Sequence, residues 1–429
     1  MTGSSSSVMP AQVPSRVSHA TSPQWEQLAE AASRAEVLMR DQSETWWTAQ
    51  ASRLAHDWLA TGLPTTRLEA WKYTSLVGLH AKARKVGLGP VDVKSPPGVC
   101  VFRLSQMAQQ SSLSNDDRVR VRQLLEIRSD VFTENLTKSL VVDPFIVWIP
   151  GNFKSDGPVE ITWKALPIDQ WGLGVAAIVV GAKSEVKILE TYGAGVDAQA
   201  LATFVDVGEG AVVQHLRVQA GDNKPDAGFV LASARATVGK SARYETSQVS
   251  FGSRLSREDL TVDLCAVEAE AVTDGVFIGR SNQLLDHHTN LVHRIGSTTS
   301  RQIYKGILAD ESRGVFNGRI AIEKNASGSN SSQMNKNLLL SKRVEIDTKP
   351  QLEIDNDDVK AAHGAAIGRL DSDHVFYLRS RGISMGQAVE MLARGFAYEA
   401  VQRLSSPALR DLGTREIDRG LKGLSWEAL

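Results

Sequence analysis

The chain has 429 residues, enough for two or three domains, and 42% of them are hydrophobic, which is ample for a packed core. Its 48 basic and 49 acidic residues give a formal net charge of −1, which argues against partners such as nucleic acid or an anionic membrane. Only two cysteines occur, Cys100 and Cys265, so a disulfide-rich secreted scaffold and a cysteine-cluster motif are both excluded. We therefore expect reduced thiols and a cytoplasmic protein.

Residues 1–23 are rich in serine and contain no acidic residue. A segment of this composition cannot bury enough apolar surface to fold, so we predict a disordered tail. A plastid transit peptide is the alternative, since such peptides are also serine-rich and poor in acids. The segment has a single arginine, Arg16, and no amphipathic pattern, which favours the tail.

Residues 24–143 are predicted to form a mostly helical region. Apolar residues recur at helical spacing over residues 24–63, and the four tryptophans within this stretch are interpreted as packing residues and not as a ligand-stacking surface. A second helical pattern covers residues 116–140, with Asn115 or Asp116 as the predicted N-cap.

Residues 144–383 are predicted to form a β core. More than a dozen short strand-like segments follow one another there, separated by turns that contain glycine. Almost none of this region has the pattern of a long amphipathic helix, so alternating βαβ units are excluded. Short strands at regular spacing are typical of a stacked β-solenoid, although a β-meander would also fit.

Two local signals predict where strands of this core end. Val344–Asp347 and Leu352–Asp355 each alternate apolar and acidic residues, which predicts two short strands with one buried face. Pro350 between them predicts a break in the hydrogen-bond ladder. Asn317 and Gly318 form a hairpin signal, which we interpret as a corner of the solenoid.

Residues 384–429 are predicted to be helical. Ser384 and Gln387 have the spacing of a capping box, and an apolar stripe that includes Phe396 follows at helical spacing. Pro407 ends this helix, and a weaker helical pattern follows it.

Three neighbouring histidines, His287, His288 and His293, are candidate metal ligands. His287 and His293 lie six residues apart and face the same side of a strand, whereas His288 faces the other side. Asp286 is either a ligand or a carboxylate that orients one imidazole. A metal centre needs at least three convergent ligands, so we favour hydrogen bonding within the solenoid wall or at a subunit contact.

Two rival functions remain open on the residues alone. The histidine group would suit a metal-dependent hydrolase or a cupin-like enzyme, and a bare solenoid would suit a sugar-binding surface. The 6% aromatic content gives the second little support. The sequence contains no phosphate-binding glycine loop of the Walker type, so we expect no ATP hydrolysis by this chain.

The most informative part of the chain is a set of motifs between residues 286 and 382. In order they are DHHTN, YKGIL, SRGVFNG, NLLLS, EIDTKPQLEI, DDVK, HGA and FYLRSRGI. This order closely resembles the SufB/SufD family, the scaffold subunits of the SUF iron–sulfur cluster assembly machinery, and EIDTKP is similar to the SufD branch. RLEAWKYT, at residues 67–74, is similar to the segment that closes the N-terminal helical region of that branch.

The resemblance implies a mainly β protein, a right-handed parallel β-helix core flanked by N-terminal and C-terminal α-helical regions. It also implies a non-catalytic subunit that pairs with a SufB-type paralogue and a SufC-type ABC ATPase to build and transfer nascent iron–sulfur clusters. It leaves open a homodimer when these partners are absent. No tightly bound cofactor is implied, only transient iron or a transient cluster at the heterodimer interface.

The resemblance also assigns candidate contacts. His363 is placed at the contact with the SufB-type paralogue, where a neutral imidazole would bind iron or the nascent cluster. Many SufD proteins have a cysteine two residues earlier, but this chain has Ala361 there, so it supplies no thiolate. Residues 377–383 are implied to join the solenoid to the closing helices, which dock on the ATPase. The candidate partner-binding residues are Arg381, Gly382, Met385 and Phe396.

Overall fold

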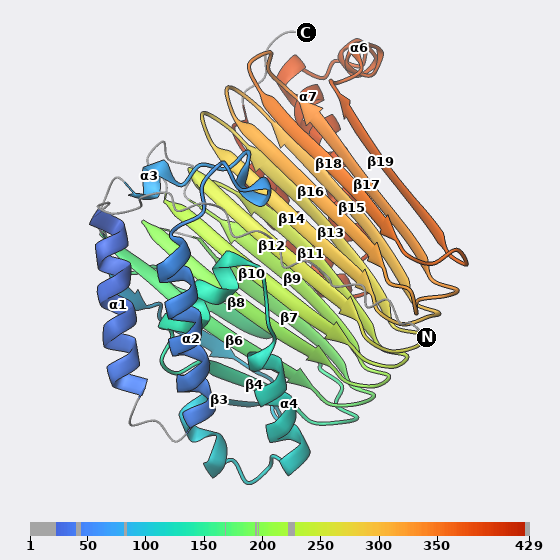
Figure 1. Ribbon diagram of the computed structural model, residues 1–429. Helices are drawn as coiled ribbons and strands as arrows, with labels where there is room; N and C mark the ends of the chain where they lie inside the picture. The colour runs from blue at the N-terminus through green and yellow to red at the C-terminus, as the bar shows by residue number, and fades with distance from the viewer. Residues whose placement is uncertain are drawn as a thin grey trace, which may run out of the picture.

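The computed structural model describes residues 23–39, 44–80, 84–167, 169–193, 195, 197–221 and 228–424. Its centre is a β-solenoid in which the chain alternates between two sheets, one strand of each sheet per turn (Figure 1). The mainly β fold with a solenoid flanked by helices at both ends of the chain is therefore confirmed. The predicted tail or transit peptide, residues 1–23, lies outside the described residues except for its last position.

The two sheets run side by side along the whole solenoid. Within the described residues one sheet has ten strands, in the sheet order β18 (Glu345–Ile354), β16 (Arg313–Ile322), β14 (Leu284–His293), β12 (Leu255–Leu264), β10 (Phe229–Val238), β8 (Ala198–Val207), β6 (Gln170–Val180), β4 (Phe145–Ile149) and β3 (Cys100–Arg103), with β1 (Lys85–Leu88) paired to β6. The other has nine, in the order β19 (Lys360–Gly368), β17 (Asn330–Leu339), β15 (Thr299–Leu308), β13 (Glu270–Gly279), β11 (Arg243–Phe251), β9 (Val212–Ala220), β7 (Glu185–Tyr192), β5 (Val159–Trp163) and β2 (Val91–Lys94). Pairing is parallel except at the beginning, where β3 runs antiparallel to β4 and β2 to β5.

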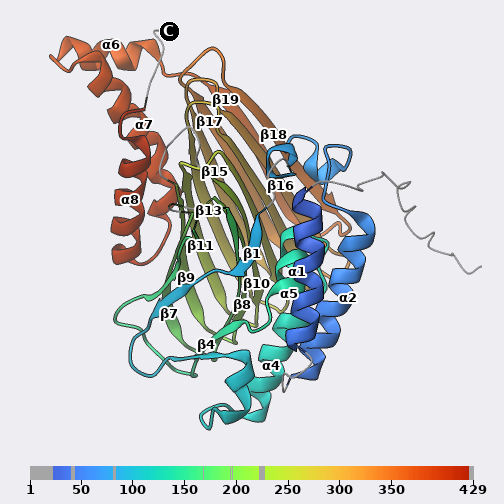
Figure 2. The same ribbon diagram turned by 90° about the vertical axis from the view of Figure 1, so that its left-hand side faces the viewer.

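Helices cover the outer faces of both sheets, on opposite sides of the solenoid (Figure 2). The N-terminal set, which packs on the ten-stranded sheet, comprises α1 (Pro23–Met39), α2 (Thr45–Thr61), η1 (Glu69–Trp71), α3 (Val77–His80), η2 (Leu104–Gln109), α4 (Asn115–Glu126) and α5 (Phe132–Leu140). The C-terminal set comprises α6 (Ser372–Ser380), α7 (Met385–Gln402) and α8 (Pro407–Leu421). Of these, α7 and α8 pack on the nine-stranded sheet. No helix in the described part of the chain is both long and apolar enough to cross a membrane.

The solenoid interior is held together by apolar side chains stacked at matching positions of successive turns. Val180, Val207, Val238 and Leu264 are register partners along the ten-stranded sheet, and each is at most 1% exposed. Because helices also cover the outer faces, the middle strands are buried on both sides, and all ten residues of β12 are buried. Parallel strands covered on both faces lose the alternating pattern and read as continuous buried runs.

The two short strands predicted around residue 350 are one strand. β18 runs without interruption from Glu345 to Ile354, and Pro350 pairs with Gly318 of β16 within it. Proline removes one donor from a ladder, which an edge strand tolerates because one of its sides has no neighbour. β18 is the edge strand of its sheet, so the proline does not interrupt the hydrogen-bond ladder.

The hairpin signal at Asn317 and Gly318 marks neither a hairpin nor a corner. Both residues lie in the middle of β16, which pairs in parallel with β14 and β18. A Cβ atom at Gly318 would lie 2.3 Å from Gln333 Nε2 and 2.7 Å from the Phe316 ring. Glycine is therefore required at this position by close packing across the interior and not by a turn.

Element boundaries differ from the predicted ones in three places. The strand ladder ends at Gly368 and α6 begins at Ser372, so helix starts well before residue 384. The helical pattern over residues 24–63 is divided between α1 and α2, and the region 24–143 also contributes β1, β2 and β3. The helix expected over residues 116–140 is two helices, α4 and α5, and the cap of α4 is Ser114. The capping box at the start of α7 is confirmed.

Candidate functional site

The last turn of the solenoid, made of β18 and β19, is its most exposed part. β18 pairs only with β16 and β19 only with β17, so each leaves one hydrogen-bonding edge without a neighbouring strand among the described residues. No residue of either strand is buried, in contrast to the strands at the middle of the solenoid. We call this turn the open end. Exposed strand edges are templates for pairing with another chain.

His363 lies on β19 at the open end and belongs to the face that lines the solenoid interior. Its register partner on β17 is Gln333, whose side chain is buried between the two sheets next to Gly318. Ala361, two residues earlier and therefore on the same face, packs against the interior apolar cluster. The His363 side chain is exposed because no further turn follows it among the described strands.

Polar side chains of three successive turns form a hydrogen-bonded ladder beneath His363. Gln302 donates from Nε2 to Thr273 Oγ1 over 3.0 Å, and Gln333 donates from Nε2 to Gln302 Oε1 over 2.7 Å. The Thr289 hydroxyl also donates to Gln302 Oε1, over 3.0 Å, which fixes the orientation of that amide. Gln333 Oε1 is buried and has no hydrogen-bond partner among the described residues. The ladder therefore offers one unused acceptor to the turn that carries His363.

Deeper in the solenoid a buried ionic network links β7, β9 and β12. Glu190 Oε2 lies 3.3 Å from both His215 Nε2 and Arg217 Nε, and Arg217 Nη2 lies 3.5 Å from Glu258 Oε2. Burial raises the pKa of Glu258 to about 8. Burial also opposes ionisation of Glu190, but the His215 hydrogen bond and the Arg217 charge lower its pKa to about 2. All four side chains are at most 3% exposed, so the network lies wholly in the interior and presents no group to solvent.

The histidine group predicted as a candidate metal site divides between two faces of β14. His287 points between the sheets, where its ring stacks on Phe277 at a centroid distance of 5.0 Å and burial lowers its pKa to about 3. His288 points toward the N-terminal region, with its Nε2 atom 3.0 Å from Asp286 Oδ1. Asp286 also lies 3.0 Å from Arg257 Nη1, so this carboxylate belongs to a cluster of ion pairs.

His293 shares a face with His287, as predicted, but does not approach it. Six residues of strand separate the two side chains by about 20 Å. His293 Nδ1 is 2.7 Å from Thr298 Oγ1 and its Nε2 is 2.8 Å from Ser300 Oγ, so both ring nitrogens are hydrogen-bonded. The described residues contain no group of three or more histidine, cysteine, aspartate or glutamate side chains able to hold a metal ion. Facing the same side of a strand therefore does not bring His287 and His293 together, and the hydrogen bonds of His293 agree with the favoured interpretation, hydrogen bonding within the solenoid wall.

The segment that joins the solenoid to α7 is an exposed surface. Phe376 is 73% exposed and Tyr377 58% exposed, and the Arg381 guanidinium lies 5.2 Å from the Tyr377 ring centroid. Gly382 follows α6 with a φ of +83°, which favours glycine, and Met385 begins α7 half-buried. The sequence interpretation placed Tyr377 in the joint between the solenoid and the closing helices and gave Phe376 no role, so it missed the two adjacent aromatics as a surface.

Phe396 has a different position from the other predicted partner contacts. It is half-buried and packs on the cluster between α7 and the nine-stranded sheet. Lys305 Nζ donates to the Phe396 carbonyl oxygen over 2.8 Å and lies 4.3 Å from the centre of its ring. Arg403 forms an ion pair with Asp274 of the same sheet. These contacts hold α7 on the solenoid, so Phe396 occupies the position of a packing residue.

The fold and the motifs at the open end agree with a family comparison. The family model described as SUF system FeS cluster assembly, SufBD core domain, matches residues 173–396, from within β6 to within α7. The match covers more than half of the chain and includes His363. The chain therefore belongs to the SufBD family of iron–sulfur cluster assembly proteins.

Three relatives show how far the similarity extends. The iron–sulfur cluster assembly protein SufD of Escherichia coli is 29% identical over 399 residues, which cover 87% of this chain and 93% of that protein. An iron–sulfur cluster assembly SufBD family protein of Synechocystis is 31% identical over 301 residues, 66% of this chain and 64% of its own length. The chloroplastic protein ABCI7 of Arabidopsis thaliana is 32% identical over 171 residues, 40% of this chain and 36% of its own length. The resemblance inferred from the motifs is confirmed, and this chain is a component of iron–sulfur cluster assembly.

Proposed function

We propose that this chain is a SufD-type scaffold subunit that acts in the cytoplasm and has no catalytic group of its own. It pairs with a SufB-type paralogue and with a SufC-type ABC ATPase, and together they build nascent iron–sulfur clusters and pass them on. Iron and sulfur are cargo in this function, so the chain requires no tightly bound cofactor. The observation that carries the proposal is the open end, where free strand edges and an exposed imidazole coincide.

The paralogue docks on the open end. A related solenoid can continue both sheets there, because β18 and β19 each leave an edge free in the described chain. β19 has the sequence KAAHGAAIG, so its small side chains allow the backbone of a partner to come close. When the paralogue is absent, the same edges can accept a second copy of this chain, which gives a homodimer.

His363 contacts iron or the nascent cluster at this interface. In one orientation its ring N–H donates to the unused Gln333 Oε1, and the other ring nitrogen keeps its lone pair for iron. Ala361 supplies no thiolate on the same face, so the remaining ligands come from the paralogue. His363 is then the one contribution of this chain to the coordination of the cargo.

The ATPase docks on the surface formed by α6 and the start of α7. This surface contains the exposed side chains of Phe376, Tyr377 and Met391, and the last is 49% exposed. Arg381 and Met385 lie on the same segment. Aromatic, methionine and arginine side chains are the types enriched at protein interfaces.

The scaffold role is tested by expressing the full chain with a SufB-type paralogue and a SufC-type ATPase. We expect the three proteins to co-purify, and we expect His363→Ala to leave the complex intact while it lowers cluster build-up during reconstitution. His56→Ala, which alters an exposed histidine on α2, is the matched control. Unchanged cluster yield and iron content in the His363→Ala complex would remove the ligand role and keep the scaffold role. Failure of the wild-type chain to bind either partner would overturn the scaffold role itself.

ATPase docking is tested separately with Phe376→Ser. This side chain is exposed, so its loss weakens ATPase binding without unfolding α6. Phe396→Asp is the contrasting variant, because a charge placed against the sheet costs several kcal/mol and detaches α7. Wild-type retention of the ATPase by Phe376→Ser would show that the docking surface lies elsewhere.

A further inference from the structure

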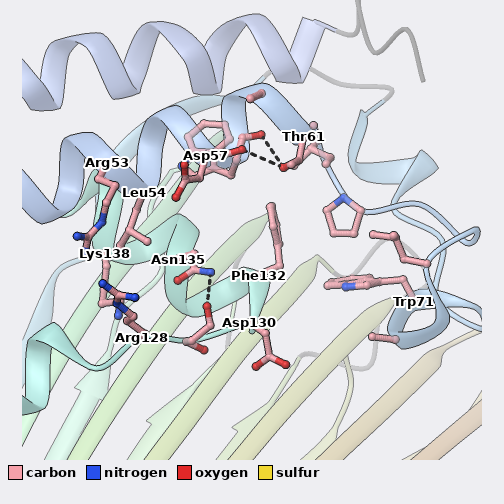
Figure 3. A pocket seen from close by; sticks show the side chains of 18 of the residues that line it. Arg53, Leu54, Asp57, Thr61, Trp71, Arg128, Asp130, Phe132, Asn135 and Lys138 are labelled. Carbon is pink, nitrogen blue, oxygen red and sulfur yellow. Dashed lines mark hydrogen bonds between the residues drawn. The ribbon is translucent and has the colours of Figure 1, made fainter. Parts of the chain in front are cut away.

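A second candidate site lies in the N-terminal helical region. A cavity of about 1130 Å³ opens between α2, residues 62–71 that follow it, and residues 126–138 around the start of α5 (Figure 3). Pockets for small organic ligands have volumes of several hundred to about 1000 Å³. None of the residues that line this cavity belongs to β18, β19 or α6, although Glu69 of the lining forms an ion pair with Lys349 of β18.

Three aromatic side chains, Trp58, Trp71 and Phe132, line the cavity, and we call them the aromatic wall. Trp58 is held by its indole N–H, which donates to Ser139 Oγ over 2.7 Å. Trp71 packs edge-to-face with Phe132 at a centroid distance of 6.0 Å, and the Arg257 guanidinium lies 4.1 Å from the Trp71 ring. These contacts orient the rings before any ligand arrives. A pre-oriented aromatic wall suits a flat, apolar ligand.

Basic side chains gather at one end of the cavity, which we call the basic end. Figure 3 shows Arg53, Arg128 and Lys138 there. Lys138 is 1% exposed, and its Nζ donates to the carbonyl oxygen of Ile127, the neighbour of Arg128, over 2.6 Å. Burial, together with the nearby charges of Arg235 and Arg53, lowers the pKa of Lys138 to about 8. Neither Arg53 nor Arg128 forms an ion pair or side-chain hydrogen bond with another described residue.

The arrangement of charge in the cavity favours an anion at the basic end. Four basic and four acidic side chains line it, but two of the acids are already paired with bases outside the lining: Glu69 with Lys349 at 2.6 Å and Glu126 with Arg122 at 3.2 Å. With Asp57 and Asp130 counted, the formal charge of the whole lining is 4 − 4 = 0, and the preference for an anion rests on the grouping of Arg53, Arg128 and Lys138 at one end. Arg53 and Arg128 are exposed, so they can reach an anionic group there.

Two buried amides add hydrogen-bond acceptors to the same cavity. Gln50 is 5% exposed and donates to the Leu125 carbonyl oxygen over 2.7 Å, but its Oε1 atom is buried without a partner among the described residues. Asn135 donates to the Ser129 carbonyl oxygen over 2.9 Å, and its Oδ1 atom is likewise unpartnered. Buried polar atoms are normally hydrogen-bonded, so these two oxygens indicate a ligand or ordered water that carries N–H or O–H groups.

We propose that this cavity binds a small planar aromatic anion, with its ring system against the aromatic wall and its anionic group at the basic end. N–H or O–H groups on the ligand donate to Gln50 and Asn135. Binding here gives the N-terminal region a recognition function of its own, separate from the scaffold function of the solenoid.

The proposal is tested with two fluorescent probes that share a ring system. 1-Anilinonaphthalene-8-sulfonate carries an anionic sulfonate, and N-phenyl-1-naphthylamine is its neutral analogue. We expect the full-length chain to bind the sulfonate about tenfold more tightly than the neutral analogue, because only the sulfonate engages the basic end. The double variant Arg53→Gln/Arg128→Gln should lose that tenfold advantage and keep its affinity for the neutral probe.

Two further variants separate this site from general surface binding. Phe132→Ala should weaken both probes, since both use the aromatic wall. Arg34→Gln removes an exposed arginine of α1 outside the cavity and should change neither. Equal affinity of the wild-type chain for the two probes would overturn the proposal. A loss of sulfonate affinity in Arg34→Gln as large as that in the double variant would also overturn it. Circular dichroism checks that every variant is folded.

Discussion

The two ends of the solenoid differ in how the stack of parallel strands is finished. At the beginning, β2 and β3 reverse direction and pair antiparallel with β5 and β4, so the first turns are covered by the chain itself. The interior there is apolar: Ile149, Ile161 and Ile188 are all fully buried, and Phe145 packs on Trp163 at a centroid distance of 5.2 Å. We call this the capped end.

At the open end the chain turns away into α6 instead of folding back. The interior positions of β17 carry serine and amide side chains, those of β18 include Ile346 and Leu352, and β18 and β19 keep exposed side chains and free edges. Both ends finish on outermost strands of the two sheets, and they differ in the direction in which those strands pair. An uncovered strand edge can pair with another chain.

The largest expected effect contrasts one residue type at the two ends. Ile161→Ala, at the capped end, should lower the free energy of unfolding by about 2–5 kcal/mol because it leaves a cavity in a closed core. Ile367, on β19, is 51% exposed, so Ile367→Ala should change the free energy of unfolding by no more than about 0.5 kcal/mol. Urea unfolding of the two variants, each against wild type, measures both values. Equal losses would show that the open end is covered in solution.

The second prediction concerns the closed interior between the two ends. His287→Phe should raise the free energy of unfolding at neutral pH by about 1–3 kcal/mol, because both nitrogens of the buried His287 ring lack hydrogen-bond partners among the described residues. The planar replacement preserves the stacking on Phe277. Thermal unfolding at pH 7 checks the sign, and a destabilised variant would mean that an ordered water or ion occupies this part of the interior.

The third prediction concerns the pH dependence of the free energy of unfolding, again in His287→Phe. The folded-state pKa values of His287, about 3, and His293, about 4, lie below the unfolded value near 6.5, so the unfolded chain binds more protons between pH 6.5 and 4. Stability must therefore fall as the pH falls through that window, and less steeply in His287→Phe. Glu258, whose pKa burial raises, contributes with the opposite sign in both proteins and cancels in the comparison. Parallel pH profiles would show that His287 is not buried in its neutral form.

The smallest expected effect on stability concerns the ladder beneath the open end. Gln333→Leu loses one hydrogen bond but also removes an unpartnered oxygen, so we expect a change of about 1 kcal/mol or less. The ring of His363 should lose its preferred tautomer, which nitrogen-15 chemical shifts of labelled histidine report. Gln302→Leu, one turn deeper, is the matched control and should leave that tautomer less affected. An unaltered His363 signal in Gln333→Leu would remove the positioning role of the ladder.

Much of the fold could be predicted from the sequence because its signals are local. Short glycine-bounded strands with no amphipathic helix among them indicated the solenoid, and helical spacing located the two helical regions. The capping box at Ser384 and Gln387 was predicted correctly because both partners lie within one turn of helix. The ordered motifs that end in FYLRSRGI also identified the family, which the match to residues 173–396 confirms.

Other features were not predictable because they depend on register between strands about thirty residues apart. The sequence alone could not show that Pro350 sits harmlessly on an edge strand, or that Gly318 is needed for close packing across the interior. It put His287 and His293 on one face but gave no distance between them. The hydrogen bonds that join Gln333 to Gln302 and Thr273 form only once β13, β15 and β17 are stacked.

The sequence by itself thus determined the solenoid, its helical flanks and the family, since hydrophobic periodicity, turn residues and caps act over a few residues. The tertiary structure alone decided which end is capped, which residue lies under His363, and where Arg53, Arg128 and Lys138 meet. Those arrangements depend on contacts between residues far apart in the chain. They arise only when the buried faces of separate elements pack together, and no local pattern encodes them.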